Sequence, residues 1–110
     1  MLNHITIMGR LTRDPELRMT QSGAGVLPVP MATNGRRKNA QSGEWEDAPV
    51  YVDVAVTGKR ALALAERLRK GTRVAVEGRL RWRQWERDGQ KRSKLDVVAD
   101  EVELLSPPVG

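Results

Sequence analysis

Apolar and polar residues alternate along most of the chain, and this two-residue period is the pattern of half-buried β-strands. In residues 50–58, VYVDVAVTG, the valines fall on one side while Tyr51, Asp53 and Ala55 fall on the other. The same period predicts strands over residues 4–11, 26–34, 72–85 and 92–105. The chain is therefore expected to be built mainly from strands.

One segment has a helical pattern instead. In residues 59–71, KRALALAERLRKG, small and apolar residues recur at helical spacing, at Ala61, Leu64, Ala65 and Leu68. Gly71 occupies the position of a C-terminal cap, because glycine adopts the left-handed conformation that ends many helices. The pattern predicts one helix between the third and fourth strands.

Glycines, prolines and polar residues mark the connections. Asp88-Gly89 is a strong hairpin-turn pair, and the polar residues 35–49 predict a long exposed loop. Pro28 and Pro30 lie within a predicted strand, although proline cannot donate a ladder hydrogen bond. We therefore expect part of that strand to lie at a sheet edge or to form a bulge.

Three strands, one helix and two strands, in that order, match the five-stranded oligonucleotide-binding barrel, or OB-fold. We expect an all-β, five-stranded OB-fold barrel with one α-helix between strands 3 and 4 and a long basic hairpin between strands 4 and 5. A generic small barrel or an α+β sandwich has the same element order, and the pattern alone does not separate these folds.

The chain has 110 residues, of which 39% are hydrophobic and 30% charged, as is typical of one folded domain. We expect this domain to span residues 1–105, followed by a short flexible tail at residues 106–110. The absence of cysteine excludes disulfides and cysteine-based metal sites, and no apolar run has the length of a membrane span. Because no signal peptide is evident either, a cytoplasmic location is expected.

The net charge of +5 favours an anionic polymer or surface as a partner, but a charged surface kept for solubility explains it equally well. The distribution of the charge is more informative. Within residues 72–85 the alternation places four residues on one face: Arg79, Arg81, Arg83 and Trp85. We assign this face to solvent and to an anionic partner. On the opposite face we assign Leu80 to the barrel interior, and Trp82 either caps the barrel or packs inside the hairpin.

No constellation of catalytic or metal-binding residues stands out in the sequence. Five carboxylates are conceivable magnesium ligands of a nuclease: Asp14, Glu16, Asp96, Asp100 and Glu101. Carboxylates scattered over strands are most commonly solvated surface, and the single histidine, His4, is expected at the surface or at a subunit interface. We therefore expect no enzyme activity, no metal and no cofactor.

Several stretches share their pattern with one known family. HITIMGRLTRDPELRMTQSG, VYVDVAVTGKRALALAERLRKG, VAVEGRLR, DGQKR and VVADEVELL follow one another across nearly the whole chain. They resemble the opening, the third strand and helix, and the second half of the DNA-binding domain of bacterial single-stranded DNA-binding proteins. The resemblance implies an OB-fold that forms homotetramers.

The resemblance also implies a function, namely sequence-independent binding and protection of single-stranded DNA during replication, recombination and repair. The binding would use base stacking and phosphate neutralisation, in the cytoplasm and associated with the nucleoid. Replication and repair proteins are expected as partners only if an acidic tail follows Gly110, because such tails recruit them in the family. The alternative function is an OB-fold accessory or assembly protein with weakened single-strand affinity.

The resemblance assigns particular residues to the DNA. Trp85 and Tyr51 match stacking positions of the family, and Lys59 matches its GK pair. Tyr51 lies opposite the valines of its strand, so we expect it to face outward. Trp45 either stacks a base at the edge of the groove or packs back against the barrel. The expected nucleic-acid-binding residues are Trp85, Tyr51, Arg79, Arg81, Arg83, Arg36, Arg37, Lys38, Lys59, Lys91, Arg92, Lys94 and Trp45.

The sequence departs from the family at aromatic positions. It contains no phenylalanine, and Arg36, Arg37 and Thr57 stand where the family often has aromatic residues. Two expected stacking rings are therefore missing, and Arg37 is a candidate to replace one of them by laying its guanidinium group on a base. These departures, together with the two prolines, motivate the alternative of weakened affinity.

Overall fold

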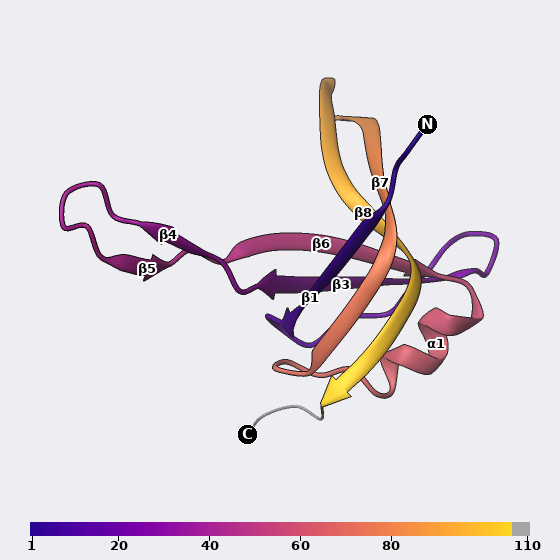
Figure 1. Ribbon diagram of the computed structural model, residues 1–110. Coiled ribbons are helices and arrows are strands. Elements are labelled where there is room, and N and C mark those ends of the chain that lie inside the picture. Colours follow the sequence, from indigo (N-terminus) through magenta and orange to yellow (C-terminus); the bar gives the residue numbers. More distant parts are fainter. Residues whose placement is uncertain (107–110) are drawn as a thin grey trace.

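The computed structural model describes residues 1–106, which form eight strands and one helix (Figure 1). The long strands are β1 (Ile5–Leu11), β3 (Gly25–Thr33), β6 (Val50–Thr57), β7 (Arg73–Arg87) and β8 (Gln90–Ser106). The shorter elements are β2 (Arg18–Met19), β4 (Arg36–Lys38), β5 (Trp45–Asp47) and α1 (Lys59–Ala65). Ser106 ends β8, and residues 107–110 of the predicted tail lie outside the described part of the chain.

The long strands are joined into a ring. β1 pairs with β7, β7 with β8, β8 with β6 and β6 with β3, and β3 returns to β1 through the pairs Arg10–Ala32 and Leu11–Met31. This closure requires glycine at position 9, because a Cβ on Gly9 would lie 2.2 Å from the carbonyl oxygen of Ala32. The ring of five strands resembles the expected OB-fold, whereas an open sandwich with the same element order has no such closure.

The interior of the ring holds the hydrophobic core. Alternate residues of the strands point inward, so that Leu27, Val29 and Met31 of β3 are all buried. α1 packs against β3 and β6 and contributes Ala61, which is fully buried. Because the core lies inside the ring, the outward-facing side chains of β6, β7 and β8 are available for a binding site.

The helix α1 is shorter than the sequence predicted. It ends at Ala65, and the chain then turns so that Leu68 enters the core. Gly71 has a positive φ of 88°, but it lies in the turn before β7, where its N–H donates to the Leu11 carbonyl over 2.9 Å. The assignment of Gly71 as the helix cap was therefore wrong. α1 has seven residues, too few to cross a membrane, and no helix within residues 1–106 is longer.

β3 contains both prolines without a bulge. On one side it pairs with β6 in an unbroken register over residues 26–33. On its other side β2 pairs only at its start and β1 only near its end, so residues 27–30 have no ladder partner there among the described strands. Pro28 and Pro30 occupy this gap, and the Pro30 carbonyl accepts a hydrogen bond from the Thr12 N–H over 3.0 Å. The expectation that the prolines mark a sheet edge is confirmed.

Residues 35–49 form a β-hairpin, where an exposed loop was predicted. β4 and β5 pair antiparallel, with Arg36 opposite Asp47 and Lys38 opposite Trp45. This two-stranded sheet, which we call the β4–β5 arm, projects away from the barrel at the left of Figure 1. The expected exposure is confirmed, but the segment has regular structure.

Candidate nucleic-acid interface

β7 and β8 continue past the barrel as a long hairpin, which rises at the top of Figure 1. Its turn is Asp88-Gly89, with φ values of 52° and 78°, and two positive φ angles are what a tight two-residue hairpin turn requires. The predicted turn is therefore confirmed. From Gly78 to Arg87 the strands keep one register without a shift.

One face of this hairpin carries the residues that the alternation placed together. Arg81, Arg83 and Trp85 occupy alternate positions of β7, and residues directly opposite them on β8 share their face. Those partners are Asp96, Lys94 and Arg92, in that order. We call the surface formed by Arg79, Arg81, Arg83, Trp85, Arg92, Lys94 and Asp96 the hairpin face. Its only carboxylate is Asp96, so the hairpin face is strongly basic.

Asp96 lies at the base of the hairpin face and is only 5% exposed. Its carboxylate oxygens accept hydrogen bonds from Nε and Nη2 of Arg81, over 3.0 and 2.8 Å, and Nε of Arg83 lies 3.2 Å away. The Arg81 hydrogen bonds hold the pKa of Asp96 below its usual value, against the effect of burial. The same hydrogen bonds raise the pKa of Arg81. The sequence offered Asp96 only as a conceivable metal ligand, and nothing local in it indicated this pairing.

Trp85 lies farther along the hairpin face and is 38% exposed. The guanidinium carbon of Arg83 is 5.4 Å from the centroid of its ring, which is within the range of a cation–π interaction. Arg83 therefore contacts both the buried carboxylate and the ring. Part of the Trp85 ring remains accessible to a ligand.

The outer side of β6 extends this surface. Nζ of Lys94 lies 2.5 Å from Oδ2 of Asp53, which joins the hairpin face to β6. Tyr51 is two residues before Asp53, so it points to the same side of β6, and it is 72% exposed. The structure thus places Tyr51 facing outward, as predicted, on a surface continuous with the hairpin face.

The opposite face of the hairpin is apolar near its base. Leu80 is exposed there, and Trp82 is 61% exposed beside its cross-strand partner Leu95. The assignment of Leu80 to the barrel interior was wrong, and Trp82 neither caps the barrel nor packs inside the hairpin. The reason is that β7 extends beyond the barrel after Gly78, so side chains that continue its inward-facing alternation no longer reach the core.

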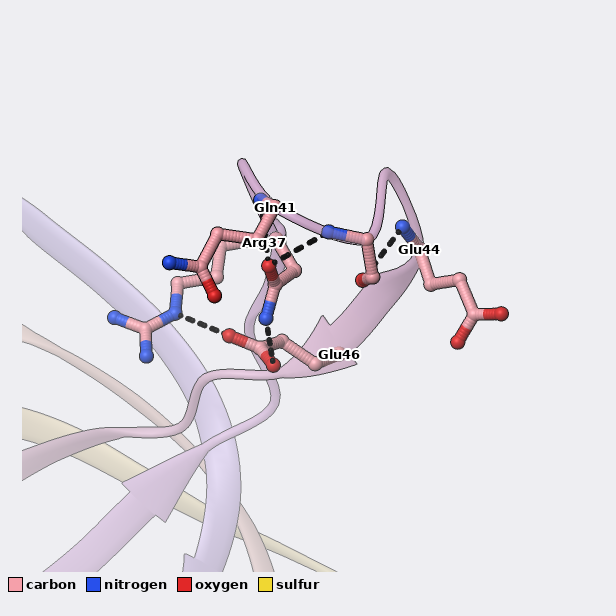
Figure 2. A network of polar contacts seen from close by, with 6 residues as sticks. Arg37, Gln41, Glu44 and Glu46 are labelled. Carbon is pink, nitrogen blue, oxygen red and sulfur yellow. Dashed lines mark hydrogen bonds and ion pairs between the residues drawn. The ribbon is translucent and has the colours of Figure 1, made fainter.

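The β4–β5 arm carries the third tryptophan. Trp45 is largely exposed opposite Lys38, so it does not pack back against the barrel. Figure 2 shows the contacts that hold the arm: Nε of Arg37 donates to Glu46 over 2.9 Å, and Nδ2 of Asn39 donates to the same carboxylate over 3.4 Å. Arg37 is therefore engaged with Glu46, on the face opposite to Trp45.

Local hydrogen bonds explain why this polar segment is ordered. Oδ1 of Asn39 accepts hydrogen bonds from the N–H groups of Gln41 and Ser42, over 2.8 and 3.1 Å, and Oγ of Ser42 accepts one from the N–H of Glu44 (Figure 2). Asparagine commonly organises turns in this way. Because β4 alternates, Arg36 shares the face of Lys38 and Trp45, whereas Arg37 does not.

Two predicted basic residues lie apart from the hairpin face. Lys91 is opposite Glu86 and points to the other side of the hairpin. Lys59 begins α1, and about 20 Å of extended strand separates it from Tyr51 at the start of β6. The structure therefore places Lys91 on the face opposite to Trp85, and Lys59 at the far end of β6 from Tyr51.

The carboxylates considered as metal ligands are dispersed over the molecule. Asp14 accepts a hydrogen bond from the N–H of Lys70 over 2.6 Å, and Asp100 pairs with Arg79 at 3.4 Å. Asp96 is occupied by two arginines. Within residues 1–106 no three metal-ligating side chains converge.

A model of the single-strand binding protein family matches residues 2–105. The single-stranded DNA-binding protein of Aquifex aeolicus is 43% identical over 110 residues, which are 100% of this chain and 74% of that protein. The Treponema pallidum protein of the same name is 38% identical over 109 residues, 99% of this chain and 61% of that protein.

Solved structures agree in fold. A deletion mutant of the single-stranded DNA binding protein from Thermus aquaticus matches with a TM-score of 0.83 and 35% identity, over 96% of this chain and 51% of that chain. A Plasmodium falciparum SSB in complex with ssDNA also has a TM-score of 0.83, at 24% identity, over 96% of this chain and 97% of that chain. The chain spans less than two thirds of the Treponema and Thermus proteins.

The buried carboxylate predicts a specific dependence of stability on pH. Because the pKa of Asp96 is lower in the folded protein than the ordinary value of about 3.9, its stabilising contribution is complete above that value. The contribution is lost as the pH falls through the lowered pKa of the folded state. We expect Asp96→Asn to reduce the free energy of unfolding at pH 7 by about 1–3 kcal/mol.

The difference between wild type and Asp96→Asn should then shrink as the pH falls from about 4 to 2. Calorimetric melting of both proteins across this range measures it. Asp100→Asn is the matched control and should change stability little, because its carboxylate is exposed. A wild-type advantage that stays constant down to the lowest pH would contradict the assignment.

Proposed function

This chain belongs to the single-strand binding protein family, and from that premise we propose that it binds single-stranded DNA without sequence preference and protects it during replication, recombination and repair. The family match over nearly the whole described chain carries the proposal. The exposed rings of Trp85 and Tyr51 among basic side chains support it independently.

In this proposal bases stack on Trp85 and Tyr51. Both rings are exposed on one continuous surface, and stacking contributes about 1–3 kcal/mol per base whatever the base. The phosphates lie along the basic side chains of the hairpin face, which release counterions as they neutralise the strand. The basic residues in this role are Arg79, Arg81, Arg83, Arg92 and Lys94.

The β4–β5 arm supplies a second place of contact. Trp45, Arg36 and Lys38 share one exposed face of the arm with Asp47, which lies opposite Arg36, so a base and its phosphates meet a ring, two cations and one carboxylate there. Three further basic residues contribute long-range attraction for the DNA strand: Lys59, Lys91 and Arg37, which is paired with Glu46.

The second candidate function is an OB-fold accessory or assembly protein with weakened single-strand affinity. One observation favours it, in addition to the missing rings: carboxylates offset several of the basic residues. The exposed pairs are Arg79 with Asp100, Lys94 with Asp53 and Arg37 with Glu46. Such pairing lowers the positive potential and so the affinity that counterion release can provide.

We further propose that the chain self-associates, as a homotetramer. β1 pairs with β7 along its length but with β3 only at Arg10 and Leu11, so residues 5–9 present a strand edge without a partner among the described strands. An open edge of this kind can add a strand from a second copy. The exposed Met8 on this strand and His4 just before it support a subunit contact there.

Titration with oligo(dT) tests the proposed function. Binding should quench tryptophan fluorescence, because stacking brings bases onto Trp85. The affinity should fall steeply with added salt, with a slope of log K against log salt of about −0.7 per phosphate neutralised. A flat titration at low salt would rule out single-strand binding, and weak quenching with a shallow slope would favour the accessory function.

Trp85→Ala should weaken oligo(dT) binding by about 1–3 kcal/mol, the usual cost of one lost stacking platform. Trp82→Ala is the matched control, because Trp82 lies on the opposite face of the hairpin, and its affinity should equal that of the wild type. Thermal melting confirms that both variants are folded. Unchanged affinity in a folded Trp85→Ala protein would remove Trp85 from the site.

The proposed assembly predicts the mass in solution. Light scattering at micromolar concentration should give four chain masses, the assembly that the family resemblance implies, whereas the β1 contact alone would join two copies. Added DNA is not needed, because the contact at β1 does not involve the hairpin face. The mass of a single chain under these conditions would contradict the proposed assembly.

A further inference from the structure

The carboxylates near the hairpin face are of two kinds. Asp100 pairs with Arg79 and Asp53 pairs with Lys94, and all four side chains are between 40% and 58% exposed. Exposed pairs contribute only about 0–1 kcal/mol each, so a DNA phosphate can replace the carboxylate as the partner of the cation. Asp53 and Asp100 therefore compete with DNA.

Asp96 is of the other kind, because its side chain is only 4% exposed and is covered by the arginines that it binds. Its two oxygens receive three contacts of 2.8 to 3.2 Å from Arg81 and Arg83. Each guanidinium group has five N–H donors, so donors remain on the outer side of both arginines for a phosphate. A phosphate can thus bind these arginines while Asp96 stays bound to them.

Arg83 links this carboxylate to the stacking ring. Its Nε lies 3.2 Å from Asp96, and its guanidinium carbon lies 5.4 Å from the centroid of Trp85. Because the guanidinium group is planar and rigid, fixing it at Asp96 also fixes the cation that faces the ring. Arg81 and Arg83 occupy neighbouring positions on one face and repel each other, and the Asp96 carboxylate, which is paired with both, offsets that repulsion.

We propose that Asp96 is a positioning residue for single-strand binding, which holds Arg81 and Arg83, and through Arg83 the ring of Trp85, in the arrangement that receives phosphate and base. This inference rests on the proposed function. It means that a negative charge strengthens the binding of a polyanion, because preorganisation of the site outweighs the repulsion that the charge causes.

Two matched substitutions separate positioning from charge. Asp96→Asn and Asp100→Asn each remove one negative charge from the same side of the hairpin, so charge counting alone predicts tighter DNA binding for both. Positioning predicts opposite signs. At low salt we expect oligo(dT) binding about tenfold weaker for Asp96→Asn, as for a lost stacking platform, and about twofold tighter for Asp100→Asn.

The predicted loss follows from the chemistry of the amide. Asparagine has one acceptor oxygen and carries two donors in place of the second oxygen, so it cannot accept the fork of Arg81 and the contact from Arg83 together. Circular dichroism and thermal melting establish that each variant is folded at the temperature of the titration.

Acrylamide quenching reports the state of the ring in the free protein. In a chain that also carries Trp45→Phe and Trp82→Phe, Trp85 is the only tryptophan, and excitation at the long-wavelength edge of its absorption band leaves Tyr51 unexcited. Asp96→Asn should raise its quenching constant about twofold, because the ring loses the guanidinium group that faces it. A carboxylate that only stabilised the fold would leave this constant unchanged in a folded variant.

Arg83→Lys provides a second variant on an exposed side chain, and it keeps the charge while removing the planar guanidinium group. Its oligo(dT) affinity should also fall, but a lost phosphate contact explains that result equally well. The quenching constant of Trp85 in the DNA-free protein is therefore the deciding measurement if Asp96→Asn does not fold: it should rise, and an unchanged constant in a folded Arg83→Lys protein contradicts the link through Arg83. A folded Asp96→Asn protein that binds oligo(dT) as tightly as the wild type, or more tightly, overturns the positioning role. Wild-type protein that does not bind oligo(dT) contradicts the proposed function instead, so the two failures are distinguishable.

Discussion

β7 and β8 stay paired from the wall of the barrel to the tip of the hairpin, and their register is fixed at both ends. The Asp88-Gly89 turn sets it at the tip, and buried residues such as Val76 and Val97 set it in the core. A slip of one residue would turn every side chain of a strand to the other face. It would pull Val76 out of the core and separate Trp85 from Asp96. Core packing and site geometry are therefore two consequences of one register.

The same register decides how the net charge of +5 can act. Counting basic residues along β7 suggests a uniformly positive surface. Asp96, however, lies directly opposite Arg81 and also contacts Arg83. Burial makes this carboxylate costly to leave without its partners, whereas the exposed Asp100 contributes little to its own pair. Charges of equal sign and similar position thus have different physical roles, and exposure is what separates them.

Periodicity and turn chemistry allowed the sequence to predict the order of the long strands, the outward direction of Tyr51 and the shared face of Trp85 with three arginines. Features that depend on where strands end or meet were not predictable. The alternation along β7 predicts an inward-facing side chain at Leu80, but Leu80 lies beyond the end of the barrel and is exposed. Asp96 meets Arg81, fifteen residues away, only through the register of the strands. The β4–β5 arm lacks apolar alternation, because side-chain hydrogen bonds hold it instead of a core.

The exposed rings share one further arrangement, since cations accompany them. Arg83 faces Trp85, Lys38 lies opposite Trp45, and Tyr51 shares its surface with the basic side chains of the hairpin face. A nucleotide holds its base and phosphate at a nearly fixed separation, so a base that stacks on one of these rings also carries its phosphate toward a cation. Stacking and phosphate neutralisation are then coupled, and removing a ring also weakens the contact of the neighbouring cation. In such a surface the position of each cation matters as much as the number of cations, and a buried carboxylate is an effective way to fix that position.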